Sequence, residues 1–70
     1  MRIKTRSTAI EAFALTKGGL KICFNSGHKY IYHDQNGEVF NRLLNAHIKG
    51  QSIGKTYHKY KYLLRLSQRL

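Results

Sequence analysis

The spacing of the apolar residues changes once along this chain, and the change indicates two kinds of secondary structure. Leu20, Ile22 and Phe24 alternate with Lys21 and Cys23, which is the period of a half-buried β-strand. Between positions 39 and 48 the apolar residues recur at helical spacing instead, which is typical of an amphipathic helix. The sequence therefore predicts an α+β fold.

Two turn signals divide the first half of the chain into three strands. The glycine pair at 18–19 separates the apolar segment 7–15 from the strand at 20–24, and Asn-Ser-Gly at 25–27 separates that strand from Tyr-Ile-Tyr at 30–32. We expect a three-stranded antiparallel β-meander. It should pack against one or two helices, because the apolar stripe of a helix and the apolar face of a strand each need a partner.

The loop at 25–27 decides which way two tyrosines point. In a three-residue loop with a left-handed Gly27, Ile22 pairs with Tyr30, and Tyr30 and Tyr32 join the apolar face. In a two-residue loop, Ile22 pairs with Ile31 and both tyrosines turn outward. The glycine at the end of the loop favours the first arrangement.

The second half of the chain is predicted to be helical at first. Asp34 or Asn36 can cap the helix at 39–48, and Gly50 can end it. The last twenty residues fit a helix or a strand, and we favour a helix to about Tyr60 followed by an extended end. This gives a basic N-terminal arm at 1–6, a single domain at 7–66 and a C-terminal tail at 67–70.

Charge is the strongest indication of function. Thirteen lysines and arginines stand against three acidic residues, so the formal net charge is +10. A chain this basic repels itself and attracts anions. Nucleic acid, an acidic protein and an anionic membrane surface are the candidate partners, in that order, and the alternative is a basic surface that only favours solubility.

Motifs for catalysis or metal binding are weak. The segment 50–56 resembles a phosphate-binding P-loop but has one residue too few between its glycines, and no βα unit surrounds it. One cysteine, Cys23, allows neither an internal disulfide nor a cysteine-based zinc site. The four histidines have no metal-ligand spacing. A metal-independent ribonuclease using His58 and Lys61 stays open, but we predict no enzyme, no metal and no cofactor.

Aromatic residues interleaved with cations point to RNA. Tyrosine rings can stack on unpaired bases while lysine and arginine neutralise phosphates. The opposite interpretation, that the tyrosines belong to the rim of the core, is also open. The predicted nucleic-acid-binding residues are Lys21, Lys29, Tyr30, Tyr32, Lys55, Lys59, Lys61, Tyr62 and Arg65.

The order of these features resembles the KTSC family. The resemblance is carried by Ser7-x-x-Ile10, by the alternating segment from Leu20 through Tyr30-x-Tyr32, by Val39-Phe40-x-x-Leu43-Leu44-x-Ala46 with Gly50, and by Tyr60-x-Tyr62. This short domain occurs at the C-terminus of some lysyl-tRNA synthetases and as stand-alone bacterial or phage proteins. The resemblance covers residues 7–66 and implies a small α+β domain with an RNA-binding role.

We therefore expect a non-catalytic nucleic-acid-binding module, with RNA as the first ligand and single-stranded DNA as the second. The alternative is a small phage-type regulator that docks on a host protein such as RNA polymerase. No window is apolar enough to span a membrane, and no apolar signal segment starts the chain. The expected location is the cytoplasm of a bacterium or a phage-infected cell.

Overall fold

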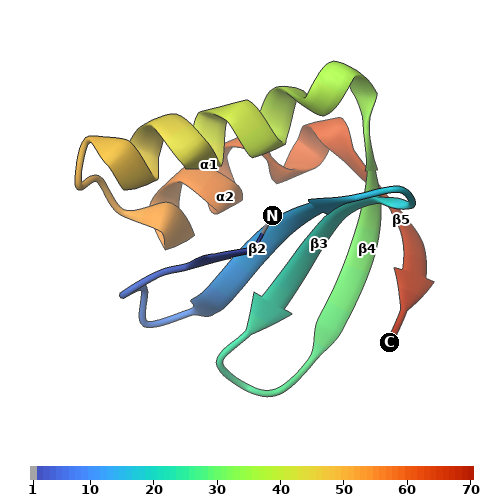
Figure 1. The fold of residues 1–70 in the computed structure, drawn as a ribbon, viewed down its shortest axis with the longest axis horizontal. Helices are drawn as coiled ribbons and strands as arrows, with labels where there is room; N and C mark the ends of the chain where they lie inside the picture. Colours follow the sequence, from blue (N-terminus) through green and yellow to red (C-terminus); the bar gives the residue numbers. More distant parts are fainter. Residues whose placement is uncertain (1) are drawn as a thin grey trace.

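The computed structural model describes residues 2–70 and has a sheet layer and a helix layer. The strands are β1 (Arg2–Lys4), β2 (Ile10–Thr16), β3 (Gly19–Phe24), β4 (Lys29–Asp34) and β5 (Leu64–Arg69). The helices are α1 (Glu38–Ile48) and α2 (Ile53–Tyr60), with short 3-10 turns at Gln35–Gly37 and Lys61–Leu63. All strands are antiparallel in the order β1-β2-β3-β4-β5, and both helices lie on one side of the sheet (Figure 1).

The α+β class is confirmed, but the predicted number of strands is wrong, because the sheet has five strands instead of three. Residues 2–4 of the predicted arm pair with β2, where Ile3 lies opposite Phe13. The extended end after Tyr60 pairs with β4, so the predicted tail at 67–70 continues β5 as far as Arg69. β1 has three residues and one apolar side chain, which is too short a pattern to predict a strand from the sequence. β5 pairs with β4, which is distant in sequence, and such pairing leaves no local signal.

The hairpin between β3 and β4 has the three-residue loop that the final glycine favoured. The amide of Phe24 donates to the carbonyl of His28 over 2.9 Å, Gly27 has a φ of +97°, and Ile22 lies opposite Tyr30. Side chains alternate along a strand, so Tyr30 and Tyr32 turn to the helix side with Ile22. Both tyrosines are half-buried there.

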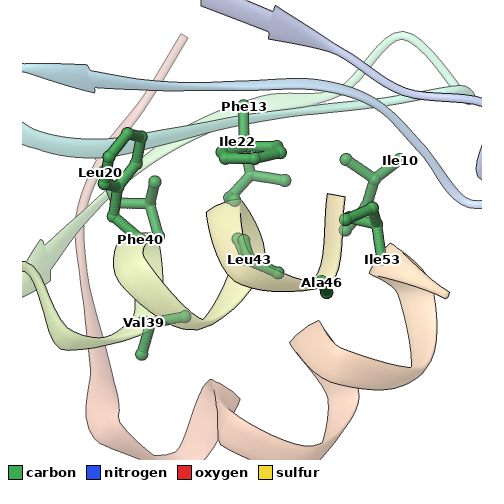
Figure 2. Close-up of a cluster of buried hydrophobic side chains, with 9 residues drawn as sticks. All are labelled: Ile10, Phe13, Leu20, Ile22, Val39, Phe40, Leu43, Ala46 and Ile53. Carbon is green, nitrogen blue, oxygen red and sulfur yellow. The ribbon is translucent and has the colours of Figure 1, made fainter. Parts of the chain in front are cut away.

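The core lies between the sheet and the two helices (Figure 2). Phe13 from β2 and Phe40 from α1 meet edge to face, with ring centroids 5.7 Å apart. Leu43 from α1 is fully buried, and Ile53 at the start of α2 is 4 % exposed. Ile53 is the one fully buried residue of α2, so it anchors this helix to the domain.

The predicted start and end of α1 are confirmed. Both carboxylate oxygens of Asp34 accept backbone N–H groups, from Val39 at 3.0 Å and from Phe40 at 2.9 Å. After the helix, Gly50 has a φ of +71°, and the amide of Gln51 donates to the carbonyl of Ala46 over 2.8 Å. This is the hydrogen bond of a Schellman end, which needs a left-handed residue and therefore favours glycine.

Neither helix within residues 2–70 has the length and apolar character needed to cross a membrane. The same stretch contains no group of three or more His, Cys, Asp or Glu that could hold a metal ion.

Candidate functional site

A groove with a volume of about 1450 Å³ lies beside the β1 edge of the sheet. One wall is the segment 4–9, which links β1 to β2. The other wall is the connection from α1 to α2 and the exposed side of α2, at 50–55, with His47, His58 and Lys59. We call this hollow the α2 groove. It exceeds the ~300–1,000 Å³ of usual small-molecule sites, so it suits a chain-like ligand better than a compact one.

The first wall is fixed by local hydrogen bonds. The Ser7 hydroxyl accepts the amides of Ala9 and Ile10 at 3.1 and 3.2 Å, and the Thr5 hydroxyl donates to the carbonyl of Ile10. Asn25, which directly follows β3, also binds this segment, because its side-chain amide donates to the Ser7 carbonyl over 2.9 Å. Such a wall loses little conformational entropy when a ligand binds.

The second wall is fixed by the end of one helix and the start of the next. The Schellman end of α1 turns the chain at Gly50, and Ser52 caps α2, where its hydroxyl accepts the Lys55 amide over 3.2 Å. The Thr56 hydroxyl donates to the Ser52 carbonyl over 2.8 Å. Together with the buried Ile53, these bonds hold the first turn of α2 in place.

The two walls meet at Gly54. A Cβ atom on this residue would lie 3.3 Å from the Ser7 hydroxyl oxygen and 3.7 Å from the Cβ of Ala9. The glycine therefore allows the first turn of α2 to approach the segment 4–9 closely, and this contact forms the bottom of the groove.

Cations stand on both walls. Lys4 and Arg6 belong to the first wall, and Lys55 and Lys59 belong to the second. The ammonium of Lys59 also lies 5.4 Å from the centroid of the Tyr60 ring. No acidic residue is among those that line the α2 groove as the structure describes it.

The three acidic residues of the chain are occupied elsewhere. Glu11 accepts from Arg2 over 3.0 Å, which is the one ion pair within residues 2–70. Asp34 caps α1. Glu38 lies in the first turn of α1, where its negative charge interacts favourably with the helix dipole. The groove cations therefore have no carboxylate partner among the described residues.

The predicted site residues fall into four places. Lys55 and Lys59 line the α2 groove. By register and alternation, Lys21, Lys29 and Arg65 lie on the sheet face away from the helices, which we call the open face. Lys61 and Tyr62 lie in the exposed 3-10 turn after α2, where Tyr62 is 77 % exposed. Tyr30 and Tyr32 lie on the helix side, so the structure does not bring all nine residues together.

The two strand tyrosines belong to an aromatic cluster between the sheet and α2. The Tyr30 ring packs edge to face on Phe24, with centroids 5.8 Å apart, and Phe24 packs in the same way on Tyr57. Burial raises the pKa of the Tyr57 phenol, and its hydrogen bond with Tyr32 raises it further. These contacts leave Tyr30 and Tyr32 only partly free for a ligand.

Most residues of the α2 groove were not predicted as site residues, among them Lys4, Arg6, Ser7 and His47. The sequence showed the first two only as part of a basic arm. Their importance depends on β1 pairing with β2, which brings the segment 4–9 next to α2. The alternation of cations with Ile3 and Thr5 at 2–6 was the one available signal.

Comparisons with models of protein families, with curated proteins and with solved structures return no match for this chain.

Proposed function

We propose that this chain is a non-catalytic nucleic-acid-binding module that holds a single strand, with RNA preferred, in the α2 groove. The observation that carries the proposal is that Lys4, Arg6, Lys55 and Lys59 line or border one groove whose lining includes no carboxylate. Four cations on two walls can neutralise successive phosphates of one strand. Their mutual repulsion falls when an anion binds between them.

Groups that can contact bases also line the groove. Imidazole rings and guanidinium planes stack on unpaired bases, and His47, His58 and Arg6 supply them here. The tyrosine platform expected from the sequence is thus replaced by histidine and arginine. A single strand fits this proposal better than a duplex, because its bases are free to enter between the walls.

Hydroxyl and amide groups favour RNA over DNA. Thr8, Gln51 and Ser52 line the groove, and such groups can donate to or accept from a ribose 2′-hydroxyl. Ser7 accepts two backbone N–H groups, so its own proton is left to donate.

The test is the salt dependence of binding to single-stranded RNA, measured by fluorescence anisotropy. Four neutralised phosphates predict a slope of log K against log salt of about −3. Lys55→Gln should weaken binding and reduce the slope by about 0.7, for one lost phosphate contact on a single strand. Lys17→Gln is the matched control, because Lys17 lies in the β2–β3 turn, at the other end of β2 from the groove, and should leave the slope unchanged.

A flat salt response of the wild-type protein would refute the proposal. So would equal effects of the two variants, because the groove would then have no special role. Capture of a host protein that survives nuclease treatment, together with a flat response, would favour the docking alternative.

A further inference from the structure

The open face of the sheet is covered by neither helix (Figure 1). The strand register places two rows of residues on it. One row runs from Lys4 through Ala12 and Cys23 to Lys29, and the next runs from Arg2 through Ala14 and Lys21 to Ile31. His33 and Arg65 lie opposite each other at the β5 side of the same face.

Small residues in the middle of this face are buried although no element covers them. Ala12 is 0 % exposed and Cys23 is 4 % exposed. Only side chains of the same face can cover them, and their neighbours in the register are Lys4, Lys29 and Lys21. Lysine stems lie along apolar surface while their ammonium groups stay in water. The middle of the open face therefore consists of small residues, with Ile31 beside them and ammonium groups around them.

The lysines of the open face have no carboxylate partner among the described residues. Arg2, opposite Ala14, also lies on the open face by register, and it takes up Glu11 in the one ion pair within residues 2–70. Lys4, Lys21, Lys29 and Arg65 consequently repel one another across the sheet. A polyanion on this face would relieve the repulsion.

Lys4 connects the two surfaces. It is among the residues that line the α2 groove, and its position opposite Ala12 places its side chain on the open face, at the border between the two surfaces. Adjacent strands lie about 4.8 Å apart, so the row from Lys4 to Lys29 extends the cationic surface by about 14 Å beyond the groove. β1, which carries Lys4, is only three residues long, so it does not separate the α2 groove from the open face.

We propose that a single nucleic-acid strand runs from the α2 groove past Lys4 onto the open face, where Lys21 and Lys29 hold its phosphates. This inference rests on the proposed function, and it adds the path of the bound strand and the length of the binding site. The open face carries no aromatic side chain within residues 2–70 apart from His33, so it binds the backbone and reads no bases. The full site then takes on the order of ten nucleotides, within the range of other single-strand binders.

The experiment compares two oligouridylates, of about 5 and about 15 nucleotides, with the double variant Lys21→Gln/Lys29→Gln. The short one can fill only the groove, so the variant should bind it as the wild type does. The long one should bind the variant about five- to tenfold more weakly, with a salt slope reduced by about 1.4, for two lost phosphate contacts. The charge-matched control is Lys17→Gln/Lys49→Gln, whose residues belong to neither surface. Thermal unfolding confirms that each variant is folded.

The two proposals fail in different ways. Equal losses for both lengths, or no loss for the long one, would overturn the path over the open face while leaving the groove in place. If Lys55→Gln does not affect the short oligonucleotide, the groove itself is refuted, and so is a path that begins in it.

Discussion

The phenol oxygens of Tyr32 and Tyr57 lie 3.1 Å apart, and their hydrogen bond joins β4 to α2 inside the half-buried aromatic cluster. Phe24 packs edge to face against the Tyr57 ring, with centroids 5.6 Å apart. This bond holds the second helix against the sheet about one turn after Ile53. Because α2 forms one wall of the groove, the position of that wall depends partly on a contact outside it.

Tyr57→Phe should lower stability at neutral pH by about 1 kcal/mol, since one partly buried hydrogen bond is lost. The raised pKa of Tyr57 adds a pH dependence. Above pH ~10 the unfolded chain ionises this phenol while the folded chain keeps its proton, so the contribution of Tyr57 to stability falls as pH rises.

The difference in urea unfolding midpoint between the wild type and Tyr57→Phe should therefore shrink as the pH rises from ~8 to ~11. Tyr62→Phe, at an exposed position, is the control and should follow the wild type at every pH. A gap between wild type and Tyr57→Phe that widens in alkali would contradict the assignment.

Tyr30→Ala should destabilise the fold by about 2 kcal/mol, less than for a fully buried aromatic residue, because Tyr30 is half-buried against Phe24. Its RNA affinity, measured at low temperature where the variant is folded, should stay within about twofold of wild type. Tyr62→Ala is the matched control, with a change within about 0.5 kcal/mol because the ring is exposed. Unchanged stability with lost affinity for Tyr30→Ala would instead restore the tyrosine platform.

Two neighbouring glycines at the β2–β3 turn, Gly18 and Gly19, should differ strongly in how much an alanine substitution destabilises the fold. Gly19 has a φ of +129°, and a Cβ there would collide with the carbonyl oxygen of Tyr32. Gly18 would meet only the side chains of Ile31 and Thr16, at 3.6 Å or more. Gly19→Ala should cost at least about 3 kcal/mol, and Gly18→Ala less than about 1 kcal/mol, in chemical denaturation. Similar costs for both would show that the sheet can shift to make room at β4.

The parts of the fold that could be predicted depend on short-range patterns. The glycine at the end of the loop 25–27 gave the correct register, and with it the side on which Tyr30 and Tyr32 lie. Asp34 and Gly50 marked the limits of α1, because caps are local chemistry. The transition near Tyr60 from helix to extended chain was also predicted correctly.

The rest depends on residues distant in sequence. β1 contains one apolar residue, Ile3, and becomes a strand only because β2 offers a partner edge. Arg6 and Lys55 come to line one groove through the packing of segment 4–9 on Gly54, which no local pattern encodes. The sequence predicted lysines for phosphate contact, but it could not divide them between the groove and the open face.

The strand order has a consequence for synthesis on the ribosome. The four strands β1 to β4 are neighbours in sequence as well as in the sheet, whereas β5 reaches β4 only after residues 35–63 have been made. Chains fold from the N-terminus as they emerge, so the outer edge of β4 stays open until β5 arrives. Open β-edges pair readily with other chains. A chain whose translation stops before Leu64 would keep this edge permanently, so truncated products should aggregate while the longer chain stays dispersed.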